Sequence, residues 1–267
     1  MQESNKTEPW ETKITEIKKD EIRIQGYRLD ELMGKRSFGD MVFLMLKGEL
    51  PTDNEGRMLD IMLVSCIDHG VTPPSTLAAL TSASTGAPYN AALAAGILSI
   101  NEHHGGAIEN SMRMLMELKE ILDNSRDSGM DFKGAADTIV QRYRTQGRKL
   151  PGFGHRVHKN DPRTAKLIDY AAGFGLDEGW IRLLNGLKDR IQSVYGNKLP
   201  VNVDGAIGAL LLELGIAPEL ANSFFIMARV PGLVAHIHEE KSIRKPMRRI
   251  DPVNHVYTGT GNRGIKD

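Results

Sequence analysis

Apolar side chains that recur every three or four residues constrain this chain most, because that period places them on one face of an α-helix. Three such runs lie at 38–46, 184–194 and 207–214. The first run stops at Gly48 with Pro51 just beyond, as expected of a helix C-terminus. After residue 30 almost no segment alternates with a period of two, so the sequence predicts an all-α class.

Shorter signals divide the rest of the chain. Residues 21–27, EIRIQGY, alternate like a short strand, and residues 56–68 are expected to form a second helix. Ser75 follows a Pro-Pro break and is expected to cap the next helix. The Ala-, Gly- and Ser-rich run at 78–100 indicates close helix packing, and the polar residues 123–134 indicate a loop between helices.

The charge balance and the single cysteine exclude several classes of function. Lys+Arg and Asp+Glu both total 34 in 267 residues, so no field of one sign would gather nucleic acid or an anionic membrane surface. Cys66 cannot form an intrachain disulfide, which favours a reducing compartment, and we interpret it as a buried small residue. The N-terminus has no apolar leader, and no stretch approaches about 18 uninterrupted apolar residues. We therefore expect a cytoplasmic protein with neither a nucleic-acid nor a membrane partner.

The segment 150–163, LPGFGHRVHKNDPR, is the most informative one for chemistry. Its glycines allow close approach of a ligand to the backbone, and its arginines and lysine supply charge for phosphate or carboxylate. A basic surface turn before a helix that begins near Pro162 explains the same composition equally well.

Three further ionisable side chains stand in apolar or glycine-rich surroundings. His104, at a predicted helix end, is either held neutral there as a hydrogen-bond donor or satisfied in a tight turn, which is the commoner case. Asp204 follows an apolar stretch and is either a helix N-cap or a partly desolvated base with a raised pKa. Arg229 lies among apolar residues and therefore requires a buried anionic partner, such as a substrate carboxylate.

The histidines give little support to a metal site. The best cluster is His236, His238 and Glu239, but a two-residue step points helical side chains apart. We expect no metal site, and the chain has no phosphate-binding loop, dinucleotide fingerprint or nucleophile elbow.

Taken in order, these segments resemble the citrate synthase family from about Ile24 onward. The motifs that carry the resemblance are GELPT at 48–52, IDHG at 67–70, HGGA at 104–107, PGFGHRV at 151–157, DPR at 161–163, NVD at 202–204, and AR at 228–229 followed by AHIHEE at 235–240. Their shared order is not a plausible coincidence.

The resemblance implies three catalytic residues. His104 would polarise the thioester carbonyl, Asp204 would exchange a proton with the acetyl methyl carbon, and His155 would act on the oxo or hydroxyl oxygen. Such a division suits general acid/base catalysis, because a neutral donor stabilises the enolate oxygen while a base takes the carbon-bound proton. The implied binding residues are His69, Arg163 and Arg229 for the carboxylates of oxaloacetate or citrate, Gly152, Phe153, Gly154 and Lys159 along CoA, and Arg244, Arg248 or Arg249 for the neighbouring subunit's site.

Three departures from a typical citrate synthase narrow the expectation. The chain is short between GELPT and IDHG, lacks one residue between Lys159 and DPR, and has RRIDPVNHVYTG near its C-terminus. The shortened form resembles stand-alone citryl-CoA lyase and the lyase portion of ATP-citrate lyase. We therefore favour citryl-CoA lyase, which cleaves citryl-CoA to acetyl-CoA and oxaloacetate. A compact citrate or 2-methylcitrate synthase, an inactive subunit of a larger assembly and an unrelated metal-binding helical protein are the alternatives.

The family resemblance also implies an organisation in two domains. Residues 1–106 and 217–267 would form a large, dimer-forming helical domain, and residues 107–216 a smaller inserted one that closes over the substrate. The expected ligands are citryl-CoA, acetyl-CoA and oxaloacetate, with the CoA thioester as substrate or product and no tightly bound cofactor. We also expect a homodimer or higher homo-oligomer. A citryl-CoA synthetase is a further expected partner.

Overall fold

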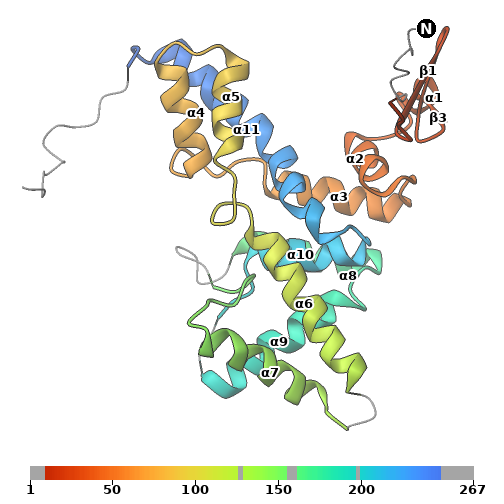
Figure 1. The fold of residues 1–267 in the computed structure, drawn as a ribbon, viewed down its shortest axis with the longest axis vertical. Helices are drawn as coiled ribbons and strands as arrows, with labels where there is room; N and C mark the ends of the chain where they lie inside the picture. Colours follow the sequence, from red (N-terminus) through yellow and green to blue (C-terminus); the bar gives the residue numbers. More distant parts are fainter. Residues whose placement is uncertain (1–9, 126–128, 155–160, 197–198, 248–267) are drawn as a thin grey trace, which may run out of the picture.

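A computed structural model describes residues 10–125, 129–154, 161–196 and 199–247 (Figure 1). The structure confirms the all-α class, since helices make up the body and the strands form one small sheet. The elements are β1 (Thr15–Lys18), β2 (Glu21–Ile24), β3 (Tyr27–Arg28), α1 (Leu29–Leu32), α2 (Phe38–Lys47), α3 (Asp53–Ser65), α4 (Pro74–Ser84), α5 (Tyr89–Leu98), α6 (Ala107–Asn124), α7 (Phe132–Thr145), α8 (Pro162–Phe174), α9 (Trp180–Tyr195), α10 (Val203–Glu213), the 3-10 turn η1 (Pro218–Leu220) and α11 (Ala221–Ile243).

Capping residues fix the ends of the first long helices. The predicted end of α2 is confirmed, because Gly48 adopts a left-handed conformation with φ of 82° and its N–H bonds back into the helix. Helix α3 begins three residues before the predicted position 56, because Thr52 and Glu55 form a reciprocal capping box.

The expectation that Ser75 caps a helix is wrong. Helix α4 begins at Pro74 with Pro73 at the N-cap, so Ser75 lies inside the first turn and is fully buried. Proline suits the first helical position, since its missing N–H would have no intrahelical partner. The Ser75 hydroxyl is therefore available for a contact inside the protein.

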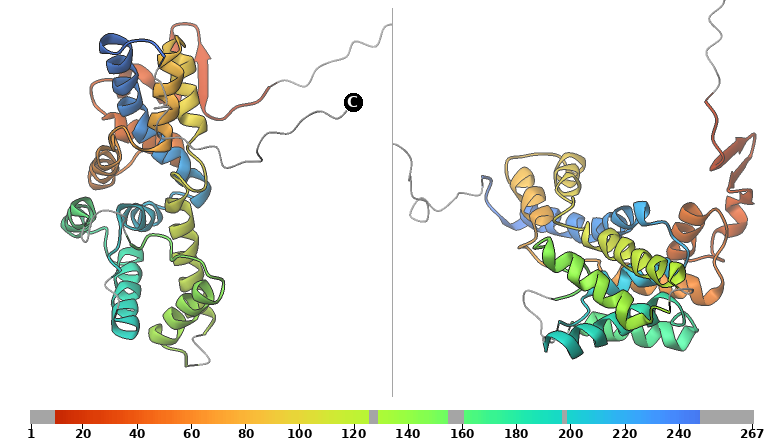
Figure 2. Two further views of the ribbon diagram at one scale, coloured as in Figure 1. Left: turned by 90° about the vertical axis from the view of Figure 1, so that its left-hand side faces the viewer. Right: turned by 60° about the horizontal axis from the view of Figure 1, so that its bottom comes forward.

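Two clusters of buried side chains hold the helices together. The larger cluster contains residues of α2, of α3 and of every helix from α6 through α11, and it is rich in Leu, Ile and Met. Helix α10 runs through it, and all four members of the predicted apolar run at 207–214 are buried there. The smaller joins α4, α5 and the second half of α11 through Ala79, Ala83, Ala92, Leu233 and Ile237. Figures 1 and 2 show α4 and α5 beside this half of α11, away from α6–α10.

The small-residue run at 78–100 packs as closely as predicted. A Cβ added at Gly96 of α5 would lie 3.0 Å from the Ser75 carbonyl oxygen and 3.1 Å from the Ala79 Cβ. Larger side chains would force α4 and α5 apart. The predicted division into domains at 107 and 216 stays a prediction.

The N-terminal strands form an antiparallel sheet in the order β1-β2-β3, which packs against α1 (Figure 1). Ile17 is paired with Ile22, and both side chains are exposed. The sheet lies at the edge of the molecule, so the helices alone build the site described next.

Helix α11 is the longest helix in the described part of the chain. By length and composition the segment Pro218–Ile243 matches a membrane-crossing helix, and it is the one described segment that does so. Its mid-helix Arg229 is buried and bonded to Cys66 just after α3, and its apolar residues belong to both clusters. These features are those of a core helix.

Candidate functional site

Asp204 lies in the first turn of α10, at the edge of the larger cluster. It is not the N-cap, because Asn202 holds that position and its side chain accepts a hydrogen bond from the Gly205 N–H at 3.0 Å. Burial raises the pKa of the half-buried Asp204 carboxyl, while the charges of Arg163 and Arg229 act in the opposite direction. Of the two interpretations of Asp204, the structure supports the desolvated carboxyl.

Arg163 is held beside Asp204 by an ion pair at the start of α8. The buried Asp161 caps this helix and accepts bonds from Arg163 Nε at 3.0 Å and from a terminal guanidinium nitrogen at 2.8 Å. The other terminal nitrogen lies 3.4 Å from the Ser65 carbonyl oxygen. A bidentate pair of this kind fixes the plane of the guanidinium. Arg163 is therefore a rigid cation beside Asp204.

Arg229 supplies a second, more deeply buried cation. Its side chain is 3% exposed, its Nε donates to the Cys66 carbonyl oxygen at 3.0 Å, and its guanidinium lies over the Phe225 ring at 4.9 Å from the centroid. Within the described chain its buried Nη1 has no hydrogen-bond partner. Burial lowers the pKa of Arg229, and the charges of Asp68 and Asp204 oppose that effect. The predicted anionic partner is thus not in hydrogen-bond contact within the described residues, and the unpartnered nitrogen is available to an anionic ligand.

His104 also contacts Phe225 and lies in the connection between α5 and α6. Its Nε2 is 2.8 Å from the Ser75 hydroxyl oxygen, and its ring meets Phe225 edge-on at 5.8 Å between centroids. Burial lowers the pKa of His104, and the positive charge of Arg229 lowers it further. The lowered pKa favours the neutral imidazole, one of the two interpretations of this histidine, and its causes are burial and a nearby cation.

The glycine turn at 152–154 is joined to the segment that leads into α10. The Gly154 N–H donates to the Pro200 carbonyl at 2.8 Å, the Asn202 N–H donates to the Gly152 carbonyl at 3.0 Å, and Phe153 pairs with Val201. Gly152 has φ of 81°, and a Cβ there would lie 2.6 Å from the Ser111 hydroxyl oxygen. Close packing therefore explains this glycine. A role of Gly152, Phe153 and Gly154 along CoA stays a prediction.

Sequence comparison defines the family of the chain. The model of the citrate synthase C-terminal domain matches residues 52–250 of the 267-residue chain. The chain belongs to the citrate synthase family. A citrate synthase of Haloferax volcanii is 31% identical over 226 residues, which cover 80% of this chain and 53% of the relative. The β chain protein 1 of Arabidopsis thaliana ATP-citrate synthase is 26% identical, covering 82% of this chain and 37% of the relative.

A solved structure of citryl-CoA lyase from Hydrogenobacter thermophilus matches the chain over nearly its whole length. It is 41% identical with a TM-score of 0.86, and the match covers 96% of this chain and 97% of that one. By contrast, this chain spans about half the length of the curated citrate synthases that it matches. The predicted citrate synthase-like fold is thereby confirmed.

The structure brings four of the described motif residues into one region. Asp204, Arg163, Arg229 and His104 come together where α3, α8, α10, α11 and the α5–α6 connection meet. The exposed His69 lies in the loop between α3 and α4, next to Asp68. His155, Lys159, Arg248 and Arg249 lie outside the described residues.

Several side chains that support the site had no clear signal in the sequence. The sequence favoured a capping role for Ser75 and assigned no role to Phe225. Their contacts with His104 and Arg229 depend on how α4 and α11 cross, which no local pattern encodes. Asp161 had a signal in the Asp-Pro dipeptide, because a capping aspartate can also face an arginine two residues later.

The candidate metal cluster is divided between two sets of partners. His236 Nε2 contacts Asp68 at 3.0 Å, whereas His238 Nδ1 contacts the Tyr89 hydroxyl at 2.8 Å. In the described part of the chain, no three His, Cys, Asp or Glu side chains are placed to hold a metal ion.

Proposed function

We propose that this protein is a citryl-CoA lyase, which cleaves citryl-CoA to acetyl-CoA and oxaloacetate. The observation that carries the proposal is the match to a lyase over 97% of that protein's length at 41% identity. The curated citrate synthases are matched less fully, since the match covers 53% and 56% of the first two. The proposal includes CoA thioesters as substrate and product, with no tightly bound cofactor.

The geometry at Asp204 suits the lyase direction. Cleavage of the citryl carbon–carbon bond leaves its electron pair on the acetyl-CoA enolate, and a proton must then reach the enolate carbon. A carboxyl with a raised pKa keeps that proton to a higher pH than an ordinary aspartate does. In this proposal Asp204 is the acid that completes acetyl-CoA, and His155 takes the citryl hydroxyl proton as the family resemblance implies.

The geometry at His104 suits stabilisation of the enolate oxygen. A neutral imidazole can donate one hydrogen bond to a developing oxyanion, whereas its other nitrogen is oriented by a second partner. The Ser75 hydroxyl at Nε2 is such a partner. Nδ1 of His104 is then the candidate donor to the thioester oxygen.

The two arginines suit the carboxylates of the citryl group. Arg229 has an unpartnered buried Nη1 among the described residues, and Arg163 is oriented by Asp161. Desolvated guanidinium groups bind carboxylates strongly and with fixed geometry. We propose that these two arginines, with His69, hold the oxaloacetate portion.

A citrate synthase is the second candidate, because relatives named citrate synthase are 30–31% identical to this chain. It would run the same carbon–carbon step in the forward direction and then hydrolyse the thioester. The two candidates differ in whether water reaches the thioester carbonyl. An inactive subunit of a larger citrate-cleaving assembly is the third.

The proposal extends to assembly and location. We propose a homodimer, supported by exposed leucines on the α4–α5 pair, where Leu77 is 52% and Leu98 76% exposed. We also propose a cytoplasmic location, supported by the one buried, unpaired Cys66. A separate citryl-CoA synthetase would supply the substrate.

The deciding experiment gives the purified protein citryl-CoA, and separately acetyl-CoA with oxaloacetate, while free CoA and all acyl products are followed. A lyase forms acetyl-CoA and oxaloacetate from citryl-CoA with little free CoA. Free CoA and citrate from the second mixture would identify a synthase instead. No turnover in either mixture would favour the inactive subunit.

A further inference from the structure

The loop at 66–70 between α3 and α4 is fastened to α11 at two backbone positions. The Cys66 carbonyl accepts the Arg229 Nε hydrogen bond at 3.0 Å. One helical turn further on, Gly232 lies so close to the loop that an added Cβ would overlap the Ile67 carbonyl oxygen. Glycine is required there because any side chain would push the loop away from the helix.

A side-chain contact fastens the same loop at a third position. His236 Nε2 lies 3.0 Å from Asp68 Oδ1, while Asp68 Oδ2 accepts the Gly70 N–H at 2.9 Å. Hydrogen bonds from this loop's backbone and from His236 hold the pKa of Asp68 below its usual range, although burial alone would raise it. An ionised Asp68 only accepts, so His236 donates from Nε2.

These three contacts lie on one face of α11. Positions 229, 232 and 236 are separated by three and four residues, which is the spacing of neighbours along a helix face. The loop they hold includes His69, and the negative charge of Asp68 on this loop raises the pKa of Arg229 against the larger lowering effect of burial. The contact between Asp68 and His236 therefore holds the loop that carries His69 on the helix that carries Arg229. The proposed function places both His69 and Arg229 at the citryl carboxylates.

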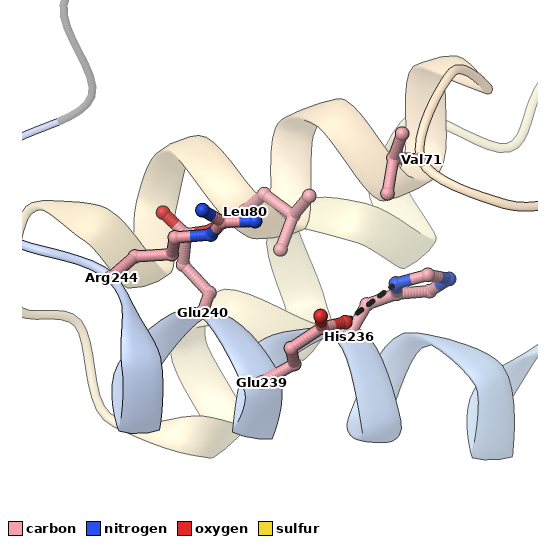
Figure 3. Close-up of a pocket in the computed structure, with 6 residues that line it drawn as sticks. All are labelled: Val71, Leu80, His236, Glu239, Glu240 and Arg244. Atoms are coloured by element: carbon pink, nitrogen blue, oxygen red, sulfur yellow. Dashed lines mark ion pairs between the residues drawn. The ribbon is translucent and has the colours of Figure 1, made fainter.

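His236 is shielded on its other side. Its Nδ1 is 4.0 Å from the Glu239 carboxylate, and Val71 and Leu80 line the small cavity of about 40 Å³ beside it (Figure 3). Figure 3 shows Glu239 reaching toward the ring from the next turn of α11. The distance from Nδ1 to Glu239 is too long for a hydrogen bond, so the bond to Asp68 is the directional contact of this imidazole among the described residues.

We infer that His236 is a positioning residue that holds the 66–70 loop on α11 through Asp68, and thereby sets His69 and Arg229 at the spacing that the citryl carboxylates require. This inference rests on the proposed function for the identity of the ligand. His236 lies seven residues beyond Arg229 on α11. It therefore acts on the ligand-binding groups through the loop.

The test compares two substitutions with the same chemistry and different reach. The Gln side chain can place its amide nitrogen near the position of imidazole Nε2, whereas Asn is one methylene too short. With citryl-CoA as substrate, we expect His236→Asn to raise KM about ten-fold, which corresponds to about 1.4 kcal/mol. We expect kcat to change by less than about three-fold, because Asp204 and His104 lie on other elements. His236→Gln should restore KM.

The matched control is His238→Ala. His238 is on the same helix and fastens α11 to Tyr89 instead of to the loop. We expect no change in KM for this variant. A KM for His236→Asn equal to that of the unsubstituted protein, or a His236→Gln variant as impaired as His236→Asn, would overturn the inference.

Hydrogen exchange separates this inference from the proposed function. In His236→Asn, amides in a peptide covering 65–72 should exchange at least about ten-fold faster than in the unsubstituted protein, with normal protection in His236→Gln and His238→Ala. That pattern in a protein that cleaves no citryl-CoA would retain the loop's attachment and reject the lyase. Unchanged exchange in His236→Asn would reject the positioning role even in an active lyase.

Discussion

The two buried clusters of this protein differ in how they fill space. The larger one, around α10, is built from Leu, Ile, Met and Phe side chains, whereas the smaller one, around α4 and α5, is built mainly from alanines. Both include residues of α11, so one helix packs by large interdigitating side chains in its first half and by close helix approach in its second. The periodicity of apolar residues along a helix therefore does not by itself decide whether the helix packs through large side chains or through close approach of the backbones.

Each cluster supports one ionisable group of the candidate site. Asp204 begins α10 in the larger cluster, and His104 is bonded to Ser75 of α4, which packs in the smaller one. Phe225 of α11 contacts His104 and Arg229 at the junction. If the two clusters contribute separately to the site and to the fold, substitutions in each should have distinct effects on turnover and stability.

Replacing Asp204 with Asn should lower turnover of citryl-CoA by about 10²–10⁴-fold, because Asn cannot supply the proton that the enolate carbon needs. The same change should stabilise the fold at neutral pH. Burial raises the pKa of Asp204, so its contribution to stability is fully present below the unfolded value of 3.8 and is lost as the pH rises through the folded value.

Steady-state kinetics and thermal melts at several pH values check both parts. We expect Asp204→Asn to raise Tm by about 2–4 °C at pH 7–8, equivalent to about 1 kcal/mol, with the difference disappearing below pH about 4. Full turnover in this variant would remove Asp204 from the mechanism. A lowered Tm at neutral pH would instead show that its charge stabilises the fold.

Leu211→Ala in α10 should lower the free energy of unfolding by about 2–5 kcal/mol, because Leu211 is fully buried in the larger cluster and its removal leaves a cavity. Denaturant titration with an unchanged m value measures the effect. The catalytic groups lie in other turns, so turnover below the melting range should be largely retained.

Ala92→Val is the counterpart in the smaller cluster, where adding volume should be harmful instead. Ala92 is fully buried where α4 and α5 approach closely, and overpacking costs about 1–3 kcal/mol. If Ala92→Val were neutral and Leu211→Ala were mild, the contrast between the two clusters would be wrong.

Ser75→Ala should lower turnover about ten-fold, equivalent to about 1.4 kcal/mol, since it removes the partner that orients His104. Thr76→Val is the matched control, because the neighbouring Thr76 hydroxyl is also buried and has no partner in the described chain. It should leave turnover unchanged and the fold equally or more stable. Equal losses in both variants would mean that α4 packing, and not the hydroxyl, supports the site.

Local patterns in the sequence were sufficient for elements whose determinants are close in the chain. The end of α2 at Gly48 and the buried face of α10 follow from spacing and from one glycine, and the structure confirms both. The pattern at 184–194 was correct for its buried leucines and isoleucine, but Val194 is exposed, because α9 reaches solvent near its C-terminus. Ser75 was misinterpreted because a serine after Pro-Pro has the composition of a cap whatever lies opposite it.

The sequence by itself determined the helical class, the family and the ionisable residues of the candidate site, because ordered motifs and helical periodicity are local properties. Only the tertiary structure decided which groups meet. It joined His104 to Ser75, left Arg229 Nη1 without a described partner, and set His236 on Asp68. These contacts join residues up to 168 positions apart, so they depend on how α3, α4 and α11 cross.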